Sequence, residues 1–200
     1  TNQNYDKELS SVFFKEFSLR KPDYFLDVKA KTLGSQIGNI ISDVEAVLVK
    51  EKPDGVFILG DTNSSLSAII ARRLKILLFH MEAGNRSFDR NVPEEVNRKI
   101  VDHISDYNIC YTEHSRRYLL AEGIAPGTIY VVGSPLTEVF SFYASKIEAS
   151  PILEELQLKS GNYLLASAHR EENIDNEENL RKLWKSFEAA AEYFSLPMIV

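Results

Sequence analysis

Residues 55–74 read GVFILGDTNSSLSAIIARRL, and this stretch decides the fold class of the chain. Its first five residues form a continuous apolar run, its middle is a polar turn that contains Gly60-Asp61-Thr62, and its last part has apolar residues at helical spacing. A strand that is buried on both faces shows no polar alternation, and such strands belong to parallel sheets. The stretch therefore predicts one β-turn-α unit.

Further apolar runs each lead into a polar turn and then a helical pattern. They occupy residues 76–79, 108–111, 128–132 and 163–166. Two more helices are expected upstream, over residues 5–17 and 33–49. Strands that alternate with helices in this way favour an α/β fold with a parallel sheet that is covered on both faces.

Gly133-Ser134-Pro135 interrupts this pattern, and the last residues before Val200 resemble the first half of a strand. We therefore expect two domains: residues 1–134 form a Rossmann-like domain without its first strand, and residues 135–200 begin a second, incomplete one. The chain does not begin with methionine, so we expect a piece of a longer protein that is truncated at both ends.

The composition is that of a globular chain, with 44% hydrophobic residues and a formal net charge of −6. This charge gives no overall basic footprint, which argues against a nucleic-acid partner. No apolar run has the length of a membrane span and no leader is visible, so we expect a cytoplasmic protein without a membrane partner. The single cysteine, Cys110, lies in an apolar run and is expected to be a buried structural thiol.

Residues 80–98, HMEAGNRSFDRNVPEEVNR, form the richest candidate site. Glu82 follows one predicted strand and Asp61 follows another, and ligands of open α/β sheets bind at the carboxyl ends of the strands. Glu94 opens the next helix, so we expect Asp61, Glu82 and Glu94 to converge in one cleft. The alternatives are that Asp61 only caps the following helix and that the segment is a solvated loop with an ion pair.

His80 and Glu82 would point the same way in an extended continuation of the strand, as a zinc-binding pair would. No second histidine or cysteine stands at metal-ligand spacing, so no metal is expected.

Pro93 is placed as the first residue of a helix, with acids in its first turn. Val96, Ile100 and Ile104 are expected on its buried side. Glu94 and Arg98 are four residues apart, which permits either a surface ion pair or a carboxylate held by a guanidinium at a cleft.

The strand over residues 163–166 delivers His169 and Arg170 to its carboxyl end. A neutral imidazole at this position could exchange protons near pH 7, and an arginine could hold a phosphate.

Together these motifs resemble a known family. Gly60-Asp61-Thr62, residues 80–86, residues 93–98 and His169-Arg170-Glu171-Glu172-Asn173 occur in the order seen in the non-hydrolysing UDP-N-acetylglucosamine 2-epimerase family. The resemblance implies two Rossmann-like domains that face each other across a cleft, as in GT-B glycosyltransferases. It places the catalytic roles on Asp61, Glu82, Glu94 and His169. It places the substrate contacts on Asp61, Glu82, Arg98, His169, Arg170 and Asn173.

The implied reaction inverts carbon 2 of a UDP-N-acetyl amino sugar by elimination and re-addition of UDP, and it uses no cofactor or metal. The resemblance also implies a homodimer in the full-length protein. It further implies that this chain alone is inactive, since family segments that hold UDP are absent.

Three departures from the usual family motifs concern the sugar. Asn85 stands where leucine is usual, the loop before Pro93 is short, and Gly133-Ser134-Pro135 replaces Gly-Asn-Thr or Gly-Asn-Ser. They resemble the branch that forms UDP-N-acetyl-L-fucosamine from UDP-2-acetamido-2,6-dideoxy-L-talose for capsule or O-antigen. A GT-B glycosyltransferase and a non-catalytic nucleotide-sugar-binding module are the alternative functions.

Overall fold

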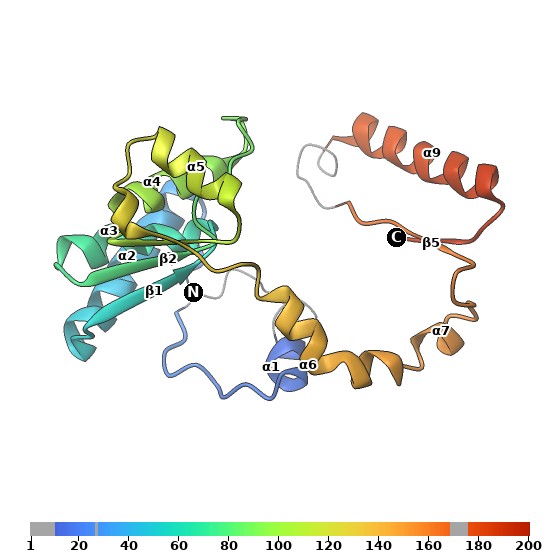
Figure 1. Cartoon of the computed structure of the whole chain (residues 1–200), viewed down its shortest axis with the longest axis horizontal. Coiled ribbons are helices and arrows are strands. Elements are labelled where there is room, and N and C mark those ends of the chain that lie inside the picture. Colours follow the sequence, from blue (N-terminus) through green and yellow to red (C-terminus); the bar gives the residue numbers. More distant parts are fainter. Residues whose placement is uncertain (1–10, 27, 169–175) are drawn as a thin grey trace. The chain divides into compact units, whose positions relative to one another are not determined.

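The computed structural model describes residues 11–26, 28–168 and 176–200 of the chain (Figure 1). The chain divides into two compact units, with the boundary between Pro135 and Leu136. This boundary lies one residue from the one expected from sequence. That the two units belong to two Rossmann-like domains stays a prediction.

The first unit is built around a four-stranded parallel sheet whose strands lie in chain order. The strands are β1 (Gly55–Leu59), β2 (Leu77–Met81), β3 (Tyr107–Cys110) and β4 (Ile129–Val131). The predicted apolar runs of this unit are therefore strands, and the α/β class with a parallel sheet is confirmed. Because all four strands run in the same direction, their carboxyl ends lie at one edge of the sheet.

Helices and short 3-10 turns precede and connect the strands of this sheet (Figure 1). They are α1 (Ser11–Glu16), α2 (Leu33–Glu51), η1 (Asn63–Ser67), α3 (Ala68–Arg73), α4 (Pro93–Ile104), α5 (Glu113–Ala121) and η2 (Pro126–Thr128). Thr32 and Thr112 begin α2 and α5, because each side chain accepts a hydrogen bond from a backbone N–H of the first turn. Pro93 is the first residue of α4, as predicted.

The core of the first unit lies on one face of the sheet. Two clusters make it up: Leu48, Ile58, Ala68, Ala71, Leu78 and Val101, and Ala83, Cys110, Leu119 and Ile129. Leu78 and Leu119 have no exposed surface, and burying such a side chain contributes about 1.5–3 kcal/mol. These contacts hold the helices α2, α3, α4 and α5 on the same face of the sheet, because the buried residues of the strands share one side of the pleat.

The described residues leave the other face of the sheet exposed, so cover on both faces stays a prediction. Phe57 and Leu59 of β1 are 58% and 63% exposed, and Tyr130 of β4 is 50% exposed. Phe79 and Tyr107 stack on this face with ring centroids 5.0 Å apart. The apolar runs have no polar alternation, but only one of their two faces is packed in the described residues.

The second unit contains α6 (Leu136–Glu148), α7 (Ile152–Glu155), β5 (Leu164–Leu165), α9 (Glu177–Phe194) and β6 (Met198–Ile199). The strands β5 and β6 pair in parallel, so the segment from β5 to β6 is a second β-helix-β arrangement. Asn176 caps α9 by accepting from the N–H groups of Glu178 and Asn179. The expected strands near residues 163–166 and at the end of the chain are confirmed.

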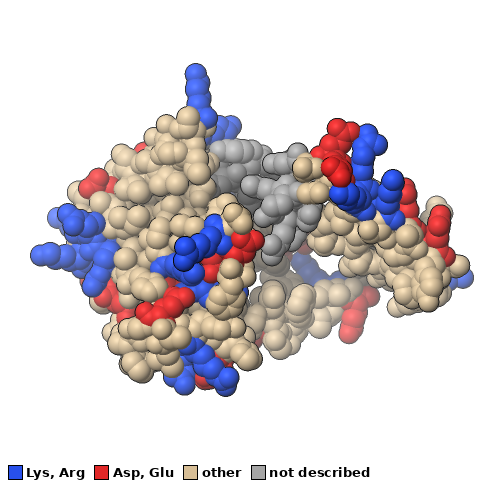
Figure 2. Space-filling model, turned by 90° about the horizontal axis from the view of Figure 1, so that it is seen from above, with Lys and Arg blue, Asp and Glu red and all other residues tan. Residues whose placement is uncertain are grey.

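Figure 2 shows one face of the molecule, on which basic and acidic side chains are interspersed. Across residues 11–26, 28–168 and 176–200, no helix is both long and apolar enough to cross a bilayer.

Candidate active site

The carboxyl edge of the sheet gathers polar side chains from three neighbouring strands. Asp61 follows β1, Glu82 follows β2 and Tyr111 follows β3. Gly60, with φ of +77°, turns the chain out of β1, and its N–H donates to the Met81 carbonyl at 3.1 Å. This parallel-sheet edge is where ligands of α/β proteins bind.

Glu82 has an uncommon backbone conformation, with φ of +70°. A residue with a side chain rarely adopts this left-handed region, and such residues concentrate at functional sites. Its Oε2 atom lies 3.4 Å from the position that a Cβ atom would occupy on Gly60, so the carboxyl group lies over the turn after β1.

The environment of Glu82 favours its protonated form. Burial raises the pKa of this carboxyl group, and the negative charge of Asp61 raises it further, against the opposing charges of Arg98 and His80. A raised pKa brings a carboxyl group closer to the neutral pH at which a general acid or base works best. The pair Asp61 and Glu82 therefore has the properties of an acid–base site.

The zinc-pair geometry considered for His80 and Glu82 does not occur. The left-handed backbone at Glu82 ends the strand alternation, and His80 is fully buried, with both ring nitrogens facing Asp102 and Gly60. Within the described part of the chain, no group of three or more potential metal ligands is present.

Arg98 of α4 brings a guanidinium to this site. Its Nη2 atom donates to the Asp61 carboxylate, and its Nη1 atom donates to the Asn85 carbonyl at 3.0 Å and to Glu95 Oε2 at 3.2 Å. Asp61 is thus held by a guanidinium from another element. The alternative role as a helix cap does not apply, because the first turn after Asp61 is closed by the backbone, from Ser65 N–H to Thr62 O.

The buried side of α4 is mainly polar, apart from the core residue Val101, and of the predicted apolar side only Ile104 packs against the core, whereas Val96 and Ile100 are exposed. Val96 is 48% exposed, whereas Glu95 and Asp102 are each 1% exposed. Glu95, Arg98 and Asp102 are spaced three and four residues apart and so share one helix face. This face of α4 packs against the loop after β2, whose polar groups form hydrogen bonds with its side chains.

Glu94 is exposed in the first turn of α4, and the neighbouring Glu95 is the carboxylate that contacts Arg98. Glu95 also accepts from the Ser87 N–H at 2.9 Å and pairs with Lys99 at 3.2 Å. The Glu94–Arg98 ion pair was one of two arrangements that the spacing permits, and Arg98 pairs with Asp61 and Glu95 instead. A catalytic role for Glu94 stays a prediction.

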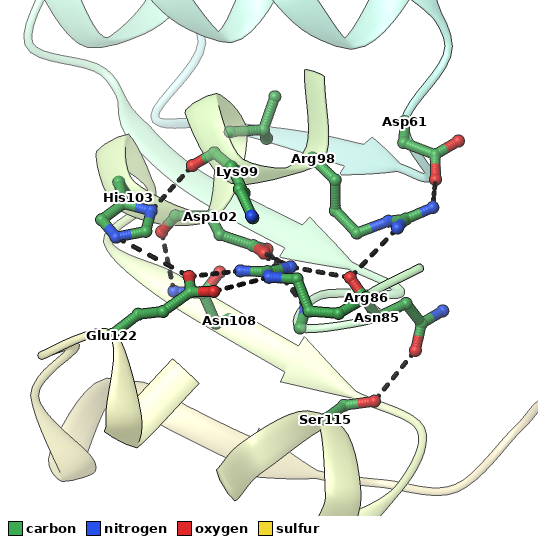
Figure 3. A network of polar contacts seen from close by, with 12 residues as sticks. Asp61, Asn85, Arg86, Arg98, Lys99, Asp102, His103, Asn108, Ser115 and Glu122 are labelled. Carbon is green, nitrogen blue, oxygen red and sulfur yellow. Dashed lines mark hydrogen bonds and ion pairs between the residues drawn. The ribbon is translucent and has the colours of Figure 1, made fainter. Parts of the chain in front are cut away.

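A polar network fixes the loop that carries Glu82 (Figure 3). The Asp102 carboxylate accepts from the Gly84 N–H at 3.2 Å and from Arg86 Nη1 at 2.7 Å. Two nitrogens of Arg86 also donate to the Glu122 carboxylate, at 2.8 and 2.6 Å. The Arg86 and Asp102 side chains have no exposed surface, so this is a buried ion network.

Asn97 supports the other half of the site. Its Nδ2 atom donates to the Asp61 carbonyl at 3.0 Å and to Asn63 Oδ1 at 3.1 Å. The sequence analysis did not single out Asn97, Asp102 or Tyr111. A signal was present, because polar residues at helical spacing on the inner side of α4 predict a buried polar face. For Tyr111, burial and the charge of Glu82 raise the pKa of the phenol.

His169, Arg170 and Asn173 lie outside the described residues, so their predicted roles stay predictions. The described site consists of Asp61, Glu82 and Arg98, which the structure brings together.

A parallel α/β sheet with paired carboxyl groups at its carboxyl edge defines a class of ligand-binding α/β proteins that includes many enzymes. Residues 1–200 match the UDP-N-acetylglucosamine 2-epimerase family over their whole length, and the chain belongs to this family.

Solved structures and a sequence relative agree with this assignment. A UDP-N-acetylglucosamine 2-epimerase from Rickettsia bellii is 49% identical with a TM-score of 0.89, over 99% of this chain and 52% of that one. The Methanocaldococcus jannaschii UDP-GlcNAc 2-epimerase in complex with UDP-GlcNAc and UDP is 38% identical with a TM-score of 0.90, over 99% and 55%. A UDP-2,3-diacetamido-2,3-dideoxy-D-glucuronate 2-epimerase from Pseudomonas aeruginosa is 37% identical over 92% of this chain. The chain spans about half the length of these relatives.

Proposed function

We propose that the protein to which this chain belongs is a non-hydrolysing epimerase that inverts carbon 2 of a UDP-N-acetyl amino sugar. The observation that carries the proposal is the pair Asp61 and Glu82, in which burial and the neighbouring carboxylate raise the pKa of Glu82. The names of the relatives support the same reaction class.

The reaction needs a group that accepts a proton from carbon 2 and a group that returns one to the opposite face. In the first half, the C2–H bond and the C1–O bond to UDP break, a C1=C2 double bond forms, and the proton passes to a carboxylate. In the second half, UDP adds back to carbon 1 while a carboxylic acid protonates carbon 2. Glu82 suits one of these roles because burial and the charge of Asp61 raise its pKa, toward the pH at which a general acid or base works best.

The remaining catalytic roles are assigned from the family motifs in the sequence. Asp61, which pairs with Arg98, is the second group for proton transfer, and Glu94 at the start of α4 is the third acid of the site. His169 and Arg170 would carry the charge of the departing UDP, which a positioned donor stabilises in the transition state. His169→Asn should then lower kcat by about 10²-fold.

The sugar is proposed from the surroundings of Glu82. Asn85 donates to the Glu82 carboxylate at 3.5 Å and accepts from Ser115 Oγ at 2.9 Å, so this residue borders the acid directly. We assign the protein to the branch that converts UDP-2-acetamido-2,6-dideoxy-L-talose into UDP-N-acetyl-L-fucosamine for surface polysaccharide. UDP-N-acetylglucosamine is the other candidate.

The reaction is tested with the complete protein in deuterated water. Product formed from either UDP-sugar should carry deuterium at carbon 2, and Glu82→Gln or Asp61→Asn should lower the rate by about 10²-fold or more. Glu113→Gln, at an exposed acid of α5, is the matched control and should keep the wild-type rate. A product that retains its original hydrogen at carbon 2, or a sugar transferred to an acceptor, would refute the proposal. The ratio of kcat/KM for the two sugars decides between them.

A further inference from the structure

Two helices of the first unit begin with the same pair of hydroxyl side chains. Thr32 precedes α2 and Thr112 precedes α5, and each accepts a hydrogen bond from the backbone N–H of the serine three residues later, at 3.2 and 3.1 Å. The two hydroxyl groups of each pair also contact each other, at 2.9 Å for Thr32 with Ser35 and at 3.0 Å for Thr112 with Ser115. The two caps therefore share one geometry, and the cap of α2 is a reference for the cap of α5.

The two serines differ in their surroundings. Ser35 is exposed, and among the described residues its hydroxyl group is hydrogen-bonded only to that of Thr32. Ser115 is only 3% exposed, and its Oγ atom donates to Asn85 Oδ1 at 2.9 Å (Figure 3). A serine hydroxyl carries one hydrogen, and in Ser115 this hydrogen goes to Asn85. The Thr112 hydroxyl therefore donates to Ser115 Oγ, in the direction seen in the reference cap.

The contact with Ser115 decides how the Asn85 amide is turned. The Asn85 backbone carbonyl is already fixed, since it accepts from Arg86 Nη1 at 2.7 Å and from Arg98 Nη1 at 3.0 Å. An amide side chain has an acceptor end and a donor end. With its oxygen held by Ser115, the amide turns its Nδ2 atom toward Glu82, 3.5 Å from Oε1. Hydrogen bonds therefore run in one direction from the cap of α5 to the candidate catalytic acid.

We propose that Ser115 is a positioning residue of the epimerase site, because it keeps the N–H end of the Asn85 amide toward the Glu82 carboxyl group. The effect on the reaction rests on the proposed function, whereas the orientation of the amide does not. An N–H donor beside a carboxyl group favours the ionised form, and a reversed amide would place a carbonyl oxygen there, which disfavours that form. The orientation of one amide thus sets how readily Glu82 gives up its proton.

Other groups act on Glu82 from the neighbouring elements. They are Asp61 after β1, His80 of β2, Arg98 of α4 and Tyr111 after β3. Replacing Ser115 by alanine leaves all four side chains in place, and α5 keeps its cap because the backbone N–H of residue 115 still donates to Thr112. The substitution therefore removes only the hydroxyl group that holds the Asn85 amide.

The orientation of the amide is tested by NMR of the complete protein labelled with 15N-asparagine. The side-chain N–H signals of Asn85, assigned by their loss in Asn85→Ala, should move with pH as Glu82 ionises, and Glu82→Gln should abolish this movement. Ser115→Ala should reduce the movement, whereas Ser35→Ala should leave it at the wild-type value. Wild-type N–H signals that do not respond to the charge of Glu82 would overturn the inference, whether or not the protein is active.

The effect on the reaction is tested by a double-mutant cycle. Ser115→Ala should lower kcat by about 10-fold, the upper range for one hydrogen bond, and should move the limb of the kcat profile that reports Glu82 to higher pH. In the Asn85→Ala background the same substitution should change kcat by about 2-fold or less, because its partner is already absent. Ser35→Ala removes the matching hydroxyl group from the reference cap and should keep the wild-type rate and profile.

The outcomes separate this inference from the proposed function. If Ser115→Ala lowers kcat equally in both backgrounds, or leaves the limb at its wild-type pH, the hydroxyl group supports only the fold and the positioning role is overturned. If the wild-type protein epimerises neither sugar, the proposed function fails, while the NMR result still decides how the Asn85 amide is turned.

Discussion

Arg98 of α4 holds the carboxylate of Asp61 after β1, although the two residues are 37 positions apart in the chain. The same guanidinium also donates to the Asn85 carbonyl and to Glu95, so one side chain joins the turn after β1 to the loop after β2. The two carboxyl groups of the candidate site therefore share a common support.

Replacing Arg98 by lysine should weaken this support. Lysine keeps the charge but cannot reach three acceptors with a planar fork, so we expect a loss of about 1–3 kcal/mol in the free energy of unfolding. Urea denaturation measures it, and the exposed Arg117→Lys in α5 is the matched control. Equal stability of the two variants would contradict the bridging role of Arg98.

The raised pKa of Glu82 predicts a pH dependence of stability. Because the folded state binds the Glu82 proton more tightly than the unfolded state, the free energy of unfolding of the wild type relative to Glu82→Gln should fall as pH rises. The fall should begin near the ordinary glutamate pKa of 4.5 and end above the raised pKa of the folded state. Urea midpoints across this range measure it.

Glu95 supplies the control of opposite sign. Burial tends to raise its pKa, but hydrogen bonds from Ser87 and the charge of Lys99 outweigh burial and lower it. Its contribution to stability is therefore present above the ordinary pKa of 4.5 and is lost as pH falls through the lowered value. The free energy of unfolding of the wild type relative to each variant should therefore change with pH in opposite directions for Glu82→Gln and Glu95→Gln. A change in the same direction would show that the environments described for these acids are wrong.

Gly84 should tolerate no side chain. A Cβ atom there would lie 2.5 Å from the Ser115 carbonyl oxygen and 2.9 Å from Leu119 Cγ, and φ is +77°. We expect Gly84→Ala to cost about 3 kcal/mol or more in stability.

Gly123→Ala separates crowding from backbone strain. Gly123 has φ of +89°, but a Cβ atom there would meet open space, so the cost should be only about 1 kcal/mol. Thermal or urea unfolding of both variants measures the difference. If the two variants lost similar amounts of stability, close packing of the loop on α5 would not be the reason that residue 84 must be glycine.

Cys110 should react slowly with thiol reagents. Burial raises its pKa to about 11, so at pH 8 only about one thiol in 10³ is ionised, and the group is also inaccessible. Labelling of the native protein should be about 10²-fold slower or more than labelling in denaturant. A native rate close to the denatured rate would show that this part of the core opens readily.

The sequence by itself determined the α/β class, the parallel strands and the placement of Asp61 and Glu82 at strand ends. Apolar runs without alternation, each followed by a turn and a helix, are compatible with few other folds. It also determined Cys110 as a core residue and Pro93 as the start of α4, because both depend on local preferences.

Only the tertiary structure decided which partners meet. Val96 and Glu95 are adjacent in sequence, yet the apolar residue is exposed and the acid is buried, because the face of α4 that meets the loop after β2 offers donors to a carboxylate. Hydrophobic periodicity cannot reveal this, since it assigns polar residues to solvent. The left-handed backbone of Glu82 and the enclosure of His80 between Asp102 and Gly60 likewise depend on contacts between residues about 20 positions apart, which no local pattern encodes.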